Sequence, residues 1–369
     1  MKLAVFSAQT YDKFFLNQPR ANALLNPSDE VQAAVSPEPD TSIEIVYHNF
    51  ALSDETVSLA AGASAICVFV NDTLSEGVLT SLHSLGVRAI LLRCAGYNNV
   101  DLEAAERLGL FVANVPSYSP EAVAEFAVAL VQTLNRNTHR AYNRVREANF
   151  SLDGLLGRTL HGRTVGIIGT GKIGVAFARI MRGFGCELLA YDPFHSDEFA
   201  KYGEYTTLEN LLSRADIVSL HCPLIESTRH IINKTTLSQM KKDAILVNTS
   251  RGGLVDTKAV IAALKRKHLG GLALDVYEHE RALFYTDHSG TIIDDDVLMR
   301  LVTFHNVIVT GHQAFFTDEA LHEIADASLQ NLADFVHGRE CKNALVQPNQ
   351  EQGAAPIKRA RSDTIPIRI

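Results

Sequence analysis

The second half of the chain alternates short apolar runs with amphipathic helical stretches, and this alternation constrains the fold more than any other feature. Parallel strands covered on both faces appear as continuous apolar runs, and a helix usually connects each strand to the next. The pattern predicts helices such as Lys172–Phe184 and Asp256–Lys267. It predicts six strands, the number in a complete dinucleotide-binding sheet: Thr164–Ile168, Glu187–Tyr191, Ile217–Leu220, Ala244–Asn248, Gly271–Asp275 and Val307–Thr310.

The first third of the chain repeats this pattern, so we expect an α/β protein with two doubly wound parallel sheets. Four strands are predicted there: Lys2–Phe6, Ile43–Val46, Ala65–Phe69 and Ala89–Leu92. The stretch 17–40, which carries prolines and asparagines, is predicted to be partly irregular. Ser119 and Pro120 predict the start of one helix that continues to about Asn149 and passes from an apolar to an arginine-rich half. A last helix is predicted over Asp318–His337.

Length, charge and cysteine content narrow the class of protein. The 369 residues suffice for two domains, and a net charge of −8 disfavours nucleic acid as a partner. No apolar run approaches the ~20 residues of a membrane span, and the N-terminus has no cleavage site typical of a signal peptide. Five cysteines, an odd number without a CxxC pair, fit a reducing compartment, so a cytoplasmic location is expected. The histidines show no metal-binding spacing, so no metal site is predicted.

The segment GTGKIG supplies a dinucleotide-binding pattern in its proper context, directly after a strand and at the start of a helix. Gly169 permits a tight turn, Gly171 lets the backbone approach a pyrophosphate, and Gly174 lets the helix lie close to the strand. Asp192 ends the next strand, near the ~20-residue spacing expected of the acid that binds the adenosine ribose. A carboxylate there accepts bonds from both ribose hydroxyls and repels a 2′-phosphate, which predicts NAD(H) rather than NADP(H). A turn without a ligand and a plain surface aspartate are the alternatives.

Three charged side chains follow three strands of the same sheet. Arg251 follows the strand Ala244–Asn248, Glu280 stands beyond the strand that ends at Asp275, and His312 follows the last strand. The carboxyl ends of parallel strands share one edge, where ligands bind in open sheets. Arginine matches a carboxylate with two parallel bonds, and histidine is suited to deliver a proton near neutral pH. The set predicts an anionic substrate and an acid–base pair, although Arg251 in a structural ion pair is a strong alternative.

Several long segments resemble the NAD-dependent D-2-hydroxyacid dehydrogenases, and most nearly the fermentative D-lactate dehydrogenases. These segments are RCAGYNNVDLEAA, GTGKIG, NTSRGGLVDTKAVIAAL, GLALDVYEHE and TGHQAFFT. The resemblance runs from the N-terminus to about Leu345. It implies a cofactor domain inserted into a discontinuous substrate domain. The substrate domain would comprise 1–117 and 316–345, the NAD-binding Rossmann domain 118–315, and a disordered basic tail 346–369.

The resemblance also implies the reaction and the roles of individual residues. It implies reduction of a small 2-keto acid by NADH to the D-2-hydroxy acid, with pyruvate to D-lactate as the first expectation. Arg251 would bind the substrate carboxylate and keto oxygen, His312 would be the general acid, and Glu280 would orient and tune His312. Backbone N–H groups of Ala95 and Gly96 would bind the carboxylate, with Tyr118 and Phe315 lining the pocket. Further positions match cofactor contacts in the family: Lys172, Ile173, Cys222, Pro223, Thr228, Thr249 and Asp275.

Two other functions fit parts of this pattern. The enzyme could act on another 2-keto acid, such as glyoxylate, hydroxypyruvate or an aryl pyruvate, because pocket residues decide that choice. Related folds also serve as NAD-sensing transcriptional corepressors, and the basic residues Lys358, Arg359 and Arg361 in the tail leave a nuclear role open. A homo-oligomer, a dimer or a tetramer, is the expected assembly.

Overall fold

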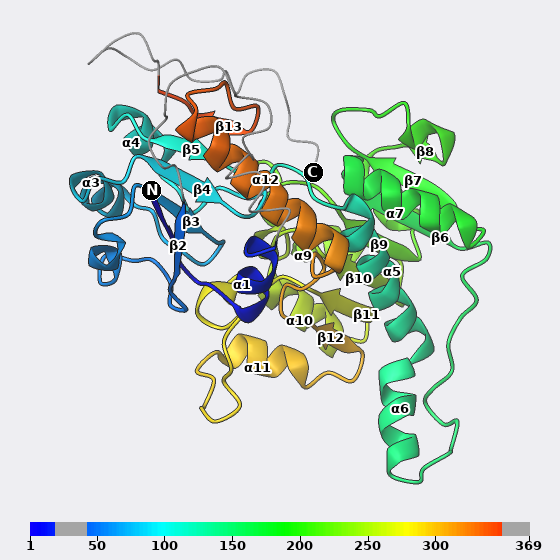
Figure 1. Ribbon diagram of the computed structural model, residues 1–369. Helices are drawn as coiled ribbons and strands as arrows, with labels where there is room; N and C mark the ends of the chain where they lie inside the picture. The colour runs from blue at the N-terminus through cyan, green and yellow to red at the C-terminus, as the bar shows by residue number, and fades with distance from the viewer. Residues whose placement is uncertain (19–42, 349–369) are drawn as a thin grey trace. The chain divides into compact units, whose positions relative to one another are not determined.

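The computed structural model describes residues 1–18 and 43–348, and divides the chain into two compact units (Figure 1). The first unit takes residues 1–118 and resumes at Thr317, and the second runs from Ser119 to Phe316. Each unit contains one sheet flanked by helices. The stretch 17–40 lies largely, and the tail beyond 348 entirely, outside the described residues.

The sheet of the first unit has the strand order β13-β5-β4-β3-β1-β2. All neighbouring strands are parallel except β13, which pairs antiparallel with β5. Helix α12 brings the chain back into this unit and packs on α1 and β4. The strands are β1 (Lys2–Val5), β2 (Glu44–Tyr47), β3 (Ala65–Val68), β4 (Ala89–Leu92), β5 (Phe111–Ala113) and β13 (Ala344–Val346). The helices are α1 (Thr10–Leu16), α3 (Glu76–Ser84), α4 (Leu102–Arg107) and α12 (Asp318–Val336).

The second unit has a wholly parallel sheet with the order β12-β11-β10-β9-β6-β7-β8. Strands β6, β7 and β8 follow one another toward one edge of the sheet, and β9, β10, β11 and β12 follow one another toward the other edge. The order therefore reverses between β6 and β9, and open parallel sheets bind dinucleotides at such a switch point. The strands are β6 (Thr164–Ile168), β7 (Glu187–Tyr191), β8 (Glu204–Tyr205), β9 (Ile217–Leu220), β10 (Ala244–Asn248), β11 (Leu269–Leu274) and β12 (Val307–Val309). The helices are α5 (Pro120–Arg136), α6 (Thr138–Arg146), α7 (Lys172–Gly183), α8 (Leu208–Arg214), α9 (Lys234–Gln239), α10 (Thr257–Lys265) and α11 (Asp296–Val302).

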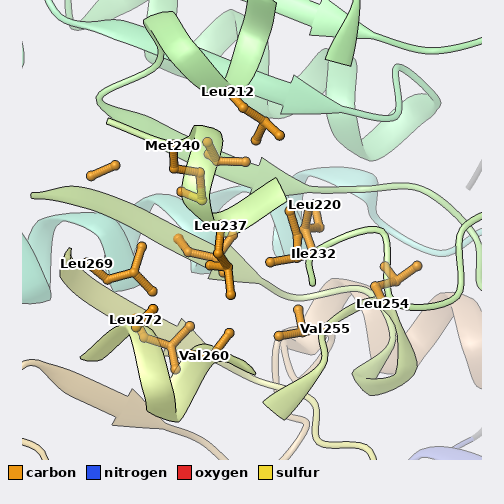
Figure 2. Close-up of a cluster of buried hydrophobic side chains, with 14 of the residues drawn as sticks. Leu212, Leu220, Ile232, Leu237, Met240, Leu254, Val255, Val260, Leu269 and Leu272 are labelled. Atoms are coloured by element: carbon orange, nitrogen blue, oxygen red, sulfur yellow. The ribbon is translucent and has the colours of Figure 1, made fainter. Parts of the chain in front are cut away.

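Side chains that alternate along these strands build two separate cores. Within β10, Leu246 faces a core shared with α8, α9 and α10, whereas Val247 faces a core shared with α5 and α7. Figure 2 shows the first of these cores, to which Leu237 of α9, Leu272 of β11 and Val260 of α10 belong. Burial on both faces explains why each strand appears in the sequence as a continuous apolar run. The predicted α/β class with doubly wound sheets is therefore confirmed.

The predicted strands and helices are present within one or two residues, with two kinds of exception. The single helix from Ser119 to about Asn149 is wrong, because Asn137 adopts a left-handed conformation (φ 51°) that ends α5 and begins α6. Asparagine tolerates this conformation and commonly ends helices. The strands β5, β8 and β13 were not predicted, since each has only two or three residues. No helix of the described segments is long and apolar enough to span a bilayer.

Candidate active site

The turn between β6 and α7 and the first turn of that helix each contain a glycine with no room for a side chain. Gly169 has φ +98°, and a Cβ there would lie 2.6 Å from the backbone nitrogen of Cys222. A Cβ on Gly174 would lie 2.1 Å from the carbonyl oxygen of Gly169. Gly171 is the N-cap of α7 and offers no capping side chain, so the first-turn N–H groups are available to an anion. Lys172 and Ile173 form the start of this helix. This geometry fits the pyrophosphate of a dinucleotide.

Asp192 follows β7 and is held against this turn. One carboxylate oxygen, Oδ2, accepts hydrogen bonds from the backbone N–H of Thr170 (2.7 Å) and from the Thr170 hydroxyl (3.0 Å). The other oxygen, Oδ1, accepts from the backbone N–H of Phe194 at 2.8 Å. The acid predicted to bind the ribose is therefore fixed beside the glycines predicted to bind the pyrophosphate.

The segments after β9 and β10 are joined to each other beyond the switch point. The Ser250 hydroxyl donates to the carbonyl oxygen of Cys222 at 2.7 Å. The Thr228 hydroxyl donates to the carbonyl oxygen of Pro223, also at 2.7 Å, and closes the following turn. The buried hydroxyl of Thr249 has no hydrogen-bond partner among the described residues. A buried hydroxyl without a partner is costly, so this atom marks a place where a ligand would bond. The residues present thus fit NAD.

Arg251 lies in the turn after β10, half-buried. Its Nη1 donates to the carbonyl oxygen of Ser250 at 2.8 Å. The side chain of Asn248 closes the same turn, since its Nδ2 donates to the Arg251 carbonyl at 2.8 Å and its Oδ1 accepts from the Ser250 N–H at 3.0 Å. No carboxylate within the described segments forms an ion pair with Arg251, so its charge remains available for an anionic ligand.

His312 and Glu280 form a direct pair. His312 Nδ1 lies 2.8 Å from Glu280 Oε1, and the second oxygen of Glu280 accepts from the backbone N–H of Tyr277 at 2.8 Å. The imidazole is 16% exposed and the carboxylate 22%. An ionised carboxylate accepts only, so Nδ1 carries the shared proton and Nε2 is the ring atom left to exchange a proton with a ligand. The backbone of His312 is left-handed (φ 55°), and the Tyr285 hydroxyl donates to its carbonyl at 3.0 Å.

Asp275 fixes the segment that carries His312, a role that the sequence analysis missed. Its buried carboxylate accepts from the Thr310 hydroxyl (2.5 Å) and from the backbone N–H groups of Gln313 (2.9 Å) and Ala314 (2.8 Å). Burial raises the pKa of Asp275, and these donors oppose that shift. Sequence places Asp275 at a strand end but does not reveal which loop folds back onto it.

The other predicted substrate-binding positions fall in both units. Ala95, Gly96 and Tyr118 belong to the first unit, and Phe315 is buried in the second. The Asn114 side chain donates to the Ala95 carbonyl at 2.8 Å, which holds the loop that was predicted to bind a carboxylate.

Arg93, at the start of this loop, is a second residue that the sequence analysis missed. It is buried, and its Nε donates to Asp12 Oδ1 at 2.9 Å. Its Nη1 and Nη2 donate to the carbonyls of Phe6 (3.0 Å) and Ser7 (2.8 Å). The arginine thus ties the end of β4 to the end of β1. Its place two residues before Ala95 was the only signal in the sequence.

Strand order brings most of the predicted residues of the second unit to one edge of its sheet. Arg251, Glu280 and His312 follow the neighbouring strands β10, β11 and β12, while Gly169 and Asp192 follow β6 and β7. Of the three charged groups, the structure joins His312 and Glu280 by a hydrogen bond. The arrangement combines a fixed cation, a proton carrier and a dinucleotide cradle, which suits hydride transfer to a carbonyl beside a carboxylate.

Comparison with known proteins places this site in a family. Residues 128–314 match the family model described as "D-isomer specific 2-hydroxyacid dehydrogenase, NAD binding domain". The chain is 64% identical to 2-hydroxyacid dehydrogenase A of Aspergillus oryzae over 94% of its length and 96% of the relative's. It is 63% identical to D-lactate dehydrogenase kk1H of Curvularia clavata over 96% and 97%. The apo-structure of D-lactate dehydrogenase from Escherichia coli superposes with a TM-score of 0.80 at 47% identity, covering 94% of this chain and all of the other.

Proposed function

The chain belongs to the D-isomer-specific 2-hydroxyacid dehydrogenases, and on this premise we propose that it reduces pyruvate to D-lactate with NADH. The hydrogen-bonded pair of His312 and Glu280 is the observation that carries the proposal, because it provides a proton carrier at the edge of an NAD-binding sheet. The choice of pyruvate rests on relatives that are named D-lactate dehydrogenases.

The chemistry divides between the cofactor and the protein. NADH, when bound, supplies the hydride for the keto carbon. Negative charge then grows on the keto oxygen, where Arg251 and the protonated Nε2 of His312 stabilise it. His312 gives its proton to that oxygen and becomes neutral. Glu280 accepts from Nδ1 and holds the ring in place.

Positive charge recognises the carboxylate of the substrate, and the size of the pocket selects its side chain. Arg251 presents a planar guanidinium suited to a carboxylate. In the family pattern, Ala95 and Gly96 are positions whose backbone N–H groups bind the substrate carboxylate. In the family pattern, Tyr118 and Phe315 are positions that contact the substrate side chain and limit the size of the 2-keto acid. Support for this assignment comes from the unpaired charge of Arg251 and from the anchoring of the loop at Ala95.

The second unit, Ser119–Phe316, is the NAD-binding domain in this proposal, and the first unit is the substrate domain. The glycines of the β6–α7 turn hold the pyrophosphate, and Asp192 binds the adenosine ribose and disfavours NADPH. Support comes from the steric demand for glycine at that turn and from the unpartnered hydroxyl of Thr249. The remaining predicted cofactor contacts are Lys172, Ile173, Cys222, Pro223, Thr228 and Asp275.

We also propose a cytoplasmic homo-oligomer without nucleic-acid or membrane partners. An odd number of cysteines, five, without a CxxC pair supports the compartment, and a net charge of −8 supports the absence of a nucleic-acid partner. Helix α6 buries none of its residues, and a helix of nine residues is marginal without tertiary packing. Leu152 and Leu156 of the segment that follows are 81% and 96% exposed. A second copy of the chain would cover this apolar surface.

Oxidation of NADH, followed by its absorbance, tests the proposed activity. We expect turnover with pyruvate to exceed that with glyoxylate, hydroxypyruvate and phenylpyruvate, and NADPH to be a poor replacement for NADH. In the reverse direction, D-lactate and not L-lactate should be oxidised. A clear preference for another 2-keto acid would correct the substrate. Absence of turnover with all four acids would overturn the proposed reaction.

A further inference from the structure

Three residues, Thr170, Tyr205 and Ser196, form a continuous chain of hydrogen bonds that ends on Asp192. The backbone N–H of Ser196 donates to the Tyr205 hydroxyl at 2.6 Å, and this hydroxyl lies 2.8 Å from the hydroxyl of Thr170. Thr170 donates in turn to Asp192 Oδ2 at 3.0 Å. Asp192 is thus connected to a tyrosine on the edge strand β8, which the sequence pattern did not reveal.

The two ends of this hydrogen-bond chain determine which group donates in each bond, because the Asp192 carboxylate only accepts and the Ser196 N–H only donates. The single hydroxyl proton of Thr170 is used on the Asp192 carboxylate, so its oxygen accepts from Tyr205. The Tyr205 hydroxyl donates to Thr170 and accepts from the Ser196 N–H. Each group has one role, and these hydrogen bonds add to the backbone N–H groups of Thr170 and Phe194 in holding one orientation of the carboxylate.

Packing fixes the tyrosine ring at the far end of the chain. The Tyr205 ring is stacked on His195, with centroids 3.9 Å apart and planes 9° from parallel, and it meets the edge of Phe199 at 5.1 Å. Tyr205 also pairs with Ala190 in the register of β7 and β8, two residues before Asp192. A two-residue strand with these contacts holds the hydroxyl in place.

We propose that Tyr205 and Thr170 are positioning residues that set the preference for NADH over NADPH. The proposal deepens the function above, since it rests on Asp192 binding the ribose. Thr170 and Phe194 occupy three of the roughly four lone-pair sites of the carboxylate, so a carboxylate held in one orientation presents its remaining Oδ1 lone pair to a ribose hydroxyl. The Asp192 carboxylate also cannot rotate away from the 2′-phosphate of NADPH, so the two negative groups repel each other and NADPH binds more weakly. Without these side-chain hydrogen bonds, only the backbone N–H groups of Thr170 and Phe194 hold the carboxylate, and it turns more freely. This freedom weakens NADH binding and relieves the penalty on NADPH.

The variant Tyr205→Phe removes the linking hydroxyl and keeps the ring. We expect the ratio of kcat/KM for NADH to that for NADPH to fall about threefold to tenfold, as loss of one neutral hydrogen bond predicts. The KM for pyruvate and kcat at saturating NADH should stay close to wild type. Tyr202→Phe is the matched control, because its hydroxyl donates to Glu198 in the same region and has no link to Thr170.

Substitutions at Thr170 test the same chain independently. Thr170→Val should lower the ratio of kcat/KM for NADH to that for NADPH at least as much as Tyr205→Phe. Thr170→Ser keeps the hydroxyl and should retain most of the wild-type ratio. The double variant Tyr205→Phe/Thr170→Val should be no worse than Thr170→Val alone, since both changes break one chain. Additive losses, or an unchanged ratio in both single variants, would overturn the proposal, even if thermal stability falls.

Asp192→Ala separates this proposal from the function on which it rests. If Asp192→Ala abolishes the preference for NADH while Tyr205→Phe leaves it intact, Asp192 binds the ribose and the positioning role is refuted. If Asp192→Ala leaves the preference intact, the assignment of Asp192 itself fails, and the positioning role fails with it.

Discussion

His221 lies beneath the glycine-rich turn, and its burial makes the NAD-binding unit sensitive to acid. Burial lowers the pKa of His221 from an ordinary 6.5 to about 3. The ring packs on Phe177, with centroids 4.9 Å apart, and its Nε2 lies 2.9 Å from the Ser219 hydroxyl. Its backbone N–H donates to the Ile168 carbonyl directly before the turn, at 2.7 Å. A proton on this ring would place an unpaired charge inside the core.

The sign and size of the effect follow from linkage between protonation and folding. Between pH 6.5 and about 3 the unfolded chain binds a proton at His221 and the folded chain does not, so stability falls as the pH falls. From these two pKa values, His221 contributes a loss of about 2 kcal/mol in the free energy of unfolding between pH 7 and pH 5. Above pH 7 the contribution vanishes.

His221→Gln removes the titration and keeps a polar group near Ser219. The variant should be less stable at pH 7, because it packs less well, yet its stability should fall about 2 kcal/mol less than that of wild type between pH 7 and pH 5. Urea unfolding followed by far-ultraviolet circular dichroism suits a chain without tryptophan. His305→Gln, at an exposed histidine, controls for the substitution itself. An acid-induced loss as large in His221→Gln as in wild type would refute the reasoning.

Three further substitutions test the site. Arg251→Ala should lower kcat roughly 10²–10³-fold and also raise the KM for pyruvate, because the guanidinium binds both the substrate and the transition state. An unchanged KM for pyruvate in steady-state kinetics would argue against carboxylate binding by Arg251. Asp275→Asn should lower kcat about tenfold, since the amide cannot accept every bond that orders the His312 segment; wild-type kcat would refute that role. Gly174→Ala should destabilise the fold by about 1–3 kcal/mol and weaken NADH binding, because the new Cβ would clash with the Gly169 carbonyl oxygen. Urea unfolding measures the change in stability, and titration with NADH measures the change in affinity.

The sequence was sufficient to predict the class of fold because strands buried on both faces have a distinctive composition. Leu246 and Val247 of β10 face different cores, so neither position tolerates a polar residue. The glycine pattern was equally informative, since Gly174 lies against the Gly169 carbonyl. Elements that depend on single residues or on distant contacts were harder to predict. The break between α5 and α6 rests on the conformation of Asn137 alone, and β13 pairs with a strand more than two hundred residues earlier.

The candidate site likewise contains residues that could be predicted from the sequence and residues that could not. Glu280 and His312 could be predicted because each follows a recognisable strand, and the structure places them within 2.8 Å of each other. The supporting residues could not, because their partners come from loops whose course depends on the whole fold. Asp275 accepts bonds from a segment beyond the next strand, and Tyr205 reaches Asp192 only through Thr170.

The rate of NADH oxidation by His312→Ala, at saturating pyruvate in a stopped-flow instrument, tests the central claim most directly. If the imidazole supplies the proton, the rate should fall roughly 10²–10⁴-fold, while the affinity for NADH, measured by titration, stays near that of wild type. A His312→Ala enzyme that oxidises NADH with pyruvate at close to the wild-type rate would contradict the role proposed for this residue.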